Sequence, residues 1–122
     1  MGIGPLSNTT DAAIVAAMNL SREQELYITN DLANYDTPGF KAQNLSFQGE
    51  LAQAIKQGPN AVMKVTGTVT ATPGFVQNNG NSVSMSAQMA NLVQSQLTYE
   101  TAVQAYNQQV TEIKIVTEGK AQ

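Results

Sequence analysis

The clearest pattern in the chain is a row of apolar positions near the C-terminus that alternates spacings of four and three residues. Gln96 and Thr117 are its polar members. This alternation is the heptad of a coiled coil, and it predicts a helix over 84–118 with Ser84 as N-cap and Gly119 as the stop. The apolar members of this predicted stripe are Met85, Met89, Leu92, Tyr99, Val103, Tyr106, Val110 and Ile113.

A second long helix is predicted near the N-terminus, over 11–34, with Asp11 as its N-cap. It should stop at a sharp corner, because Pro38 disfavours the helical region for the residue before it and Gly39 readily adopts a positive φ. We expect a β-branched residue to be resisted at Gly39. The apolar stripe of this helix consists of Ile14, Met18, Ile28 and Leu32.

The segment between the two helices follows no single period. Apolar residues over 45–55 recur as on a short amphipathic helix, which the pair Gly58–Pro59 should end. Apolar and polar positions then alternate over 63–72, as in a strand or an extended hairpin with Gly67 at a turn or bulge. Turn-forming residues fill 73–82, and this stretch is predicted to be a loop.

Together these elements predict a mainly α-helical chain whose long N- and C-terminal helices pair as an antiparallel coiled coil, with a small irregular or β-containing insert over 35–83. The 122 residues fit a single domain over 1–122. Aromatic residues make up only 6% of the chain and Trp is absent, so the side chains that usually dominate burial are scarce. We therefore expect contacts with neighbouring chains to contribute to stability.

The charge pattern excludes several functional classes. The six basic residues lie too far apart along the chain to neutralise a run of phosphates, so no nucleic-acid partner is expected. His and Cys are absent, which removes imidazole bases, thiolate nucleophiles and the usual zinc ligands. Asp31 and Asp36 lie among capping and turn residues without EF-hand spacing. We expect no catalytic site, metal, cofactor or small-molecule substrate.

Nothing near the N-terminus has the pattern of a cleavable secretory signal. Residues 1–6 contain no Lys or Arg, and the apolar run over 12–18 is too short to span a bilayer.

Two stretches carry a resemblance to a known family. Residues 30–42 read NDLANYDTPGFKA, which is similar to an N-terminal signature of flagellar rod proteins, and residues 81–89 lead into the C-terminal helix. On these stretches the chain resembles the FlgB family of flagellar basal-body rod proteins, within the bacterial flagellar axial proteins. Outside 58–79 the resemblance covers nearly the whole chain.

This resemblance implies a structural subunit of the proximal rod that polymerises through its terminal helices into a helical tube, which transmits torque and surrounds the export channel. It implies contacts with copies of itself, other rod proteins, and basal-body ring and export-gate proteins. It also implies export without signal-peptide cleavage to the basal body, outside the cytoplasmic membrane in the periplasm or cell wall. The alternative is a small soluble helical adaptor or export chaperone that holds a client helix.

Candidate assembly residues are the two apolar stripes and four residues of the corner. The corner has a plainer interpretation as a helix stop without neighbour contacts. Phe47 and Leu51 have the aromatic-x-x-x-aliphatic spacing of an export-gate motif, although an amphipathic helix face explains the same spacing. The four corner residues are Asn34, Pro38, Gly39 and Phe40.

Overall fold

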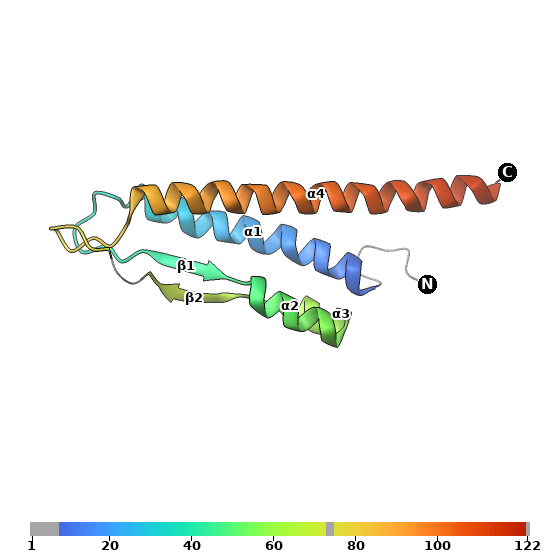
Figure 1. Cartoon of the computed structure of the whole chain (residues 1–122), viewed down its shortest axis with the longest axis horizontal. Coiled ribbons are helices and arrows are strands. Elements are labelled where there is room, and N and C mark those ends of the chain that lie inside the picture. Colours follow the sequence, from blue (N-terminus) through green and yellow to red (C-terminus); the bar gives the residue numbers. More distant parts are fainter. Residues whose placement is uncertain (1–7, 73–74, 122) are drawn as a thin grey trace.

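The computed structural model describes residues 8–72 and 75–121, with side chains up to residue 111. It consists of three layers, in which helix α1 (Thr9–Ala33) lies between helix α4 (Met85–Ala121) and the central insert (Figure 1). Helices α1 and α4 run antiparallel, and α4 extends past the start of α1 (Figure 1). The predicted mainly helical chain with two long terminal helices and a small β-containing insert is confirmed. The coiled-coil mode of pairing stays a prediction.

Helix α1 begins two residues earlier than expected. Its N-cap is Asn8, whose Oδ1 accepts a hydrogen bond from the backbone N–H of Asp11 at 2.8 Å. The prediction that Asp11 caps the helix is therefore wrong. Asn and Asp cap equally well, and no Gly or Pro lies between them to keep the intervening residues out of the helix.

The insert combines a two-stranded antiparallel sheet with two short helices. Strand β1 (Gln43–Ser46) pairs with β2 (Thr68–Ala71), and helices α2 (Gln48–Gln57) and α3 (Pro59–Met63) lie between them in the chain. Leu45 belongs to β1 rather than to a helix, because it pairs with Val69 of β2.

The strand or extended hairpin predicted over 63–72 is confirmed only as β2. Met63 instead ends α3, which Pro59 can begin because its fixed φ suits the first turn of a helix. Gly67, where a turn or bulge was predicted, has a φ of +80° and directly precedes β2. A Cβ on this residue would lie 2.8 Å from Leu45 Cδ1, so both the backbone conformation and the close approach require glycine.

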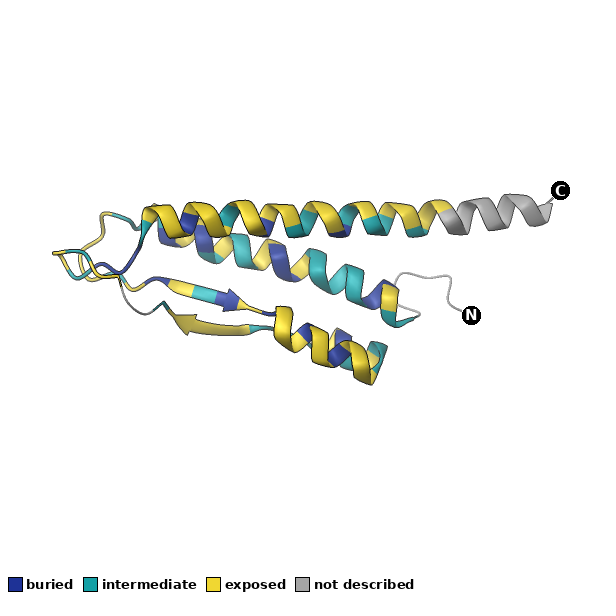
Figure 2. Ribbon diagram, viewed as in Figure 1, coloured by how far each residue is buried: buried dark blue, intermediate teal, exposed yellow. Residues whose placement is uncertain are grey.

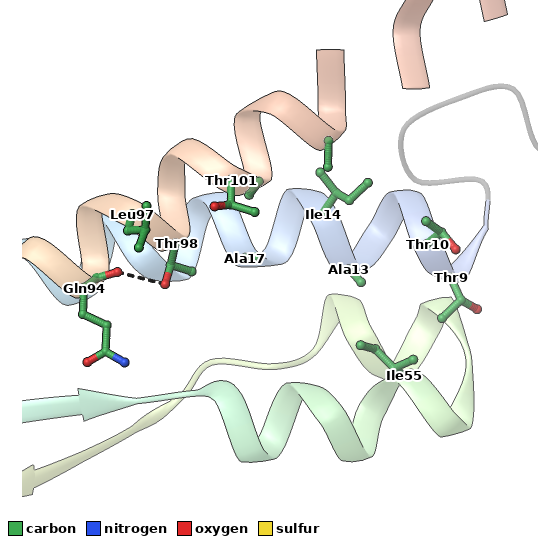
Figure 3. A pocket seen from close by; sticks show the side chains of 12 residues that line it. Thr9, Thr10, Ala13, Ile14, Ala17, Ile55, Gln94, Leu97, Thr98 and Thr101 are labelled. Atoms are coloured by element: carbon green, nitrogen blue, oxygen red, sulfur yellow. Dashed lines mark hydrogen bonds between the residues drawn. The ribbon is translucent and has the colours of Figure 1, made fainter. Parts of the chain in front are cut away.

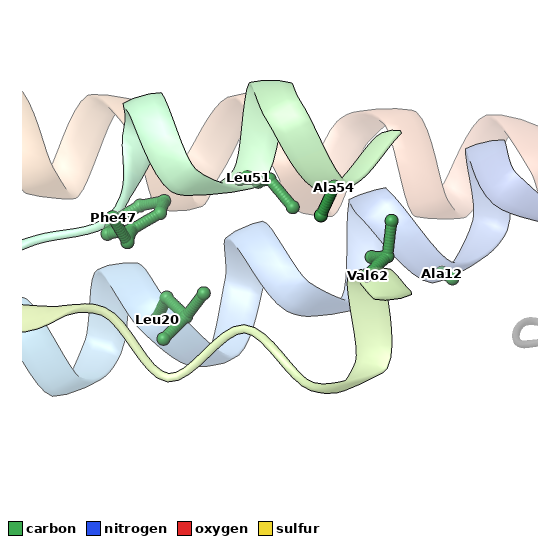
Figure 4. Packing of buried hydrophobic residues seen from close by; sticks show 6 residues of the cluster. All are labelled: Ala12, Leu20, Phe47, Leu51, Ala54 and Val62. Carbon is green, nitrogen blue, oxygen red and sulfur yellow. The ribbon is translucent and has the colours of Figure 1, made fainter. Parts of the chain in front are cut away.

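A compact apolar cluster, which we call the α1–insert core, lies between α1 and the insert (Figure 4). Small alanines of α1 allow α2 and α3 to approach closely, and Phe47 supplies the largest buried side chain. No described residue of α4 belongs to this cluster. Its buried members are Ala12, Leu20, Phe47, Leu51, Ala54 and Val62.

Helix α4 begins as predicted, since Ser84 Oγ accepts a hydrogen bond from the backbone N–H of Ala87 at 3.4 Å. The helix continues to Ala121, so the prediction that Gly119 ends it is wrong. A glycine within a helix costs only about 1 kcal/mol, and no proline follows to force a stop. Among the helices of the described residues, none has the length and apolar character needed to cross a bilayer.

Candidate assembly surfaces

The two family-like stretches meet at the corner where α1 ends and α4 begins (Figure 1). Asn34 closes α1, because its side-chain Nδ2 donates to Asn30 O at 2.8 Å. Its Oδ1 accepts a hydrogen bond from Thr37 Oγ1 at 3.1 Å. The backbone N–H of Asn34 also donates, to Asn30 O at 3.2 Å and to Asp31 O at 3.1 Å. The first family-like stretch thus builds the turn that follows α1.

Asn81 connects this turn to the start of α4. Its side chain is fully buried, and its Nδ2 donates to the carbonyl oxygens of Asn34 and Thr37, both at 2.7 Å. Its Oδ1 accepts a hydrogen bond from the backbone N–H of Val83 at 2.7 Å. A single amide therefore bonds to three backbone groups from two segments that are far apart in sequence.

Gln77 reinforces the same connection. Its Nε2 lies 3.3 Å from Tyr35 O and 3.1 Å from Val83 O. We refer to Gln77 and Asn81 as the corner amides. From the sequence, Gln77 was expected in a loop without a specific role, because a side chain that bonds to distant backbone groups leaves no periodic pattern.

The other corner residues are placed as a turn requires. Gly39 has a φ of +74°, and its N–H donates to Asn79 O at 3.0 Å. Pro38 and Gly39 are exposed, whereas Phe40 is half-buried and its carbonyl accepts a hydrogen bond from Ser82 N–H at 2.9 Å. Pro38 and Gly39 are thus accessible to a neighbouring chain.

Asp31, in the last turn of α1, anchors strand β1. Its carboxylate is buried, and Oδ1 accepts a hydrogen bond from the backbone N–H of Gln43 at 3.2 Å. Burial raises the pKa of Asp31, and the Gln43 hydrogen bond lowers it by a smaller amount. Two residues further along β1, on the same edge, Leu45 O accepts a hydrogen bond from Gln24 Nε2 at 2.8 Å. Side chains of α1 therefore occupy the edge of β1 that faces away from β2.

The contact between α1 and α4 is formed by small and polar side chains. Ser95 is buried, and its Oγ donates to Ser21 O at 2.9 Å. Gln88 and Ala102 are buried on the same side of α4. Around them, Arg22 of α1 lies 5.0 Å from the ring centroid of Tyr99.

The predicted heptad stripe of α4 lies along the border of this contact. Leu92, Tyr99, Val103 and Tyr106 are half-buried, whereas Met85, Met89 and Val110 are 42%, 48% and 45% exposed. The side chain of Ile113 lies outside the described residues. The helix therefore directs only part of the stripe toward α1, and the rest faces solvent (Figure 2).

Helix α4 also carries an exposed apolar row at four-residue spacing, which we call the outer row. It consists of Met85, Met89, Val93 and Leu97, and its last two members are 62% and 63% exposed. Residues four apart form the ridges that interdigitate when helices pack. Val93 and Leu97 were not predicted from the sequence, because the heptad spacing assigns each turn of the helix to one stripe only.

The predicted stripe of α1 separates into different environments. Ile28 is buried, Met18 and Leu32 are half-buried, and Ile14 lines a groove on the molecular surface. Leu20, a member of the α1–insert core, and Leu26, which is 69% exposed, were both missed.

A largely apolar groove of about 660 Å³ lies where α1, α4 and α2 meet (Figure 3). Alanines of α1 and α4, Ile55 of α2 and Leu97 of the outer row contribute to its lining. None of the residues that line the groove is charged. Its shape and chemistry suit the apolar face of another helix.

The candidate export residues are not on the surface. Phe47 and Leu51 are 2% and 8% exposed and belong to the α1–insert core (Figure 4). In the folded chain their spacing serves packing.

Within the described residues, no group of three or more His, Cys, Asp or Glu side chains is arranged to hold a metal ion.

Comparison with known proteins adds a consistent result. A FlgB flagellar basal body rod protein from Bacillus subtilis is 32% identical over 114 residues, covering 84% of this chain and 88% of the relative. One from Escherichia coli is 25% identical, with 77% of this chain and 82% of the relative covered. One from Borrelia hermsii is 28% identical, with coverage of 66% and 76%. No family model matches the chain.

Proposed function

The chain belongs to the FlgB family of flagellar basal body rod proteins, and from this membership we propose that it is a subunit of the proximal rod that polymerises through its terminal helices. It is a structural component of the flagellar basal body rod. In the proposed assembly, residues 1–122 act as one rod-type domain, the helices pack as coiled coils into a helical tube, and that tube transmits torque and surrounds the export channel.

The outer row is the observation that carries this proposal. Four large apolar side chains on one ridge of α4 are exposed along the part of the helix that packs on α1. Apolar surface is stabilised by roughly 25 cal/mol per Å² when it is removed from water, so such a ridge favours association. The small residues of the groove supply a complementary surface for a helix of a neighbouring subunit.

The proposed partners are copies of the same chain, other rod proteins, and basal-body ring and export-gate proteins. The proposed location is outside the cytoplasmic membrane, in the periplasm or cell wall, after export without signal-peptide cleavage. Because Phe47 and Leu51 are buried, they would act as an export signal only in the unfolded chain. Mass spectrometry of rod-incorporated protein should find no cleavage site within residues 2–20, and an N-terminus well inside that range would contradict this route.

The groove also fits a second function, that of a soluble adaptor or chaperone that holds one client helix. Light scattering at increasing protein concentration separates the two. A rod subunit should form species that continue to grow, because head-to-tail contacts do not close, whereas a chaperone should remain a monomer or a defined dimer.

The proposal is tested by placing a carboxylate on the outer row. Leu97→Glu should leave the free subunit folded, because Leu97 is 63% exposed, but it should prevent incorporation into the rod and abolish motility. Gln104→Glu, on an exposed position of the same helix, is the matched control and should retain both. Normal incorporation of Leu97→Glu would show that the outer row is not an interface. Val103→Asp is less suitable, since Val103 is half-buried and its loss also affects the free chain.

A further inference from the structure

We infer that the corner amides are positioning residues that hold α4 against α1. When their hydrogen bonds are lost, α4 detaches as one helix while the α1–insert core stays folded. The inference does not depend on the proposed function, because it concerns the unassembled chain. It assigns a specific role to Gln77 and Asn81, which join the segment before α4 to the end of α1.

The first step is the location of the apolar core. The α1–insert core is formed by α1, α2, α3 and Phe47, all on the side of α1 that faces the insert (Figure 4). Detachment of α4 would therefore leave the packing of this cluster unchanged. A unit that retains its buried apolar contacts is expected to stay folded when another element opens.

The second step is the composition of the α1–α4 contact. Among the described residues of α4, Ala102 alone is both apolar and buried, while the buried Gln88 and Ser95 are polar. The larger side chains, such as Leu92 and Tyr99, are only half-buried there. Burial of apolar surface consequently holds α4 less strongly than it holds α2 and α3.

The third step is the hydrogen bonding at the corner. Asn81 satisfies the carbonyls of Asn34 and Thr37 and the N–H of Val83, and Val83 itself is fully buried two residues before α4. Removing the amide leaves the buried N–H of Val83 without its partner. It also removes one of the two hydrogen bonds that each carbonyl accepts, because Asn34 O also bonds to Thr37 N–H and Thr37 O to Phe40 N–H. Opening the corner lets these groups reach water, so the loss favours the detached arrangement of α4.

The test is hydrogen–deuterium exchange, followed by mass spectrometry, on the full-length chain. In Asn81→Ala, amides of α4 should exchange at least about tenfold faster than in the unsubstituted chain, whereas those of α2 should change by less than about twofold. Asn78→Ala removes an exposed amide three residues away and should leave both helices unchanged. Leu20→Ala weakens the α1–insert core and should accelerate α2.

If Asn81 only stabilised the fold as a whole, its removal would accelerate exchange in all helices alike. If Asn81→Ala accelerated α2 and α4 by the same factor, or left α4 unchanged, the inference would be overturned. Gln77→Ala is the milder second variant and carries the test if Asn81→Ala does not fold. It should accelerate α4 selectively by a smaller factor, because it removes the hydrogen bonds to Tyr35 O and Val83 O while Asn81 stays in place. An equal or absent effect on α4 would again contradict the inference.

Discussion

The two sides of α1 are packed by different means. The side toward the insert buries Leu20 against Phe47, Leu51 and Val62, whereas the side toward α4 brings Ser21 against Ser95. One contact is held chiefly by apolar burial and the other by close approach and the hydrogen bond from Ser95 to Ser21 O. The insert, which connects the long helices in sequence, is thus the main partner of α1 in the core.

This difference explains how a chain of 122 residues combines a stable unit with a helix available to neighbours. The α1–insert core lies away from the outer row, so apolar residues of α4 can face solvent without weakening that core. Substitutions on the two sides of α1 should therefore differ in size and in the element they affect.

The largest effect is expected in the α1–insert core. Phe47→Ala should lower the free energy of unfolding by about 3–5 kcal/mol, because it leaves a cavity where the largest buried side chain was. Leu97→Ala, on the outer row, should change it by no more than about 0.5 kcal/mol. Urea unfolding of the unassembled chain measures both. Similar losses in the two variants would remove the proposed contrast.

Glycine substitutions sharpen the comparison within the insert and the corner. Gly67→Ala should cost about 2–4 kcal/mol, because a Cβ would lie 2.8 Å from Leu45 Cδ1 in addition to the strain of a positive φ. Gly39→Ala carries only the backbone strain, with no atom within 4 Å of the new Cβ, and should cost about 1 kcal/mol. Thermal unfolding of the two variants checks the order, and a larger loss for Gly39→Ala would contradict it.

On the α4 side, the close approach at Ser95 should limit side-chain size. Ser95→Leu should cost about 1–3 kcal/mol through overpacking against α1. Ser95→Ala removes only the hydrogen bond to Ser21 O and should cost about 0.5–1.5 kcal/mol. Urea unfolding measures the two losses. If leucine were tolerated better than alanine, the two helices would not be held at close range here.

The smallest effect concerns the pH dependence from Asp31. Burial raises its pKa in the folded state, so its contribution to stability is fully present below the ordinary carboxyl pKa of 3.8 and is lost as pH rises through the higher folded-state pKa. Asp31→Asn keeps an oxygen to accept the Gln43 N–H and cannot ionise. It should therefore be at least as stable as the unsubstituted chain at pH 7.

The advantage of Asp31→Asn should shrink as the pH approaches 4. Urea unfolding at several pH values measures this trend, with Asp36→Asn as the control on an exposed position nearby. If the stability of Asp31→Asn relative to the unsubstituted chain increased as the pH falls, the folded chain would stabilise ionised Asp31, and the prediction would be wrong.

Local patterns in the sequence predicted the long helices and the corner well. Pro38 and Gly39 lie in the turn that follows α1, where Gly39 takes the positive φ that was expected, and Ser84 accepts a hydrogen bond from a nearby backbone N–H at the start of α4. The insert was harder, because Leu45 pairs with a strand more than twenty residues away and Pro59 starts a helix after a glycine. Such contacts are decided by the folded chain rather than by local spacing.

The candidate surfaces were predictable only in part. The heptad correctly placed Leu92 and Tyr99 close to α1, where both are half-buried. The sequence period does not fix the rotation of a helix about its own axis, so it does not decide which neighbouring positions enter the contact. That rotation moves Ser95 into the contact and Met89 out of it. The role of Asn81 was equally hidden, since its partners are backbone carbonyls in another segment.

The comparison between the two sides of α1 is tested most directly by hydrogen–deuterium exchange of the unsubstituted chain, unassembled and in isolated basal bodies. In the unassembled chain, amides of α4 should exchange at least about tenfold faster than those in the central turns of α1. In the assembled rod, α4 should gain more protection than α1, because in the proposed assembly neighbouring subunits cover its outer row. If α4 were already as protected as α1 in the unassembled chain and gained nothing on assembly, α4 would be an integral part of the subunit core and the account would be wrong.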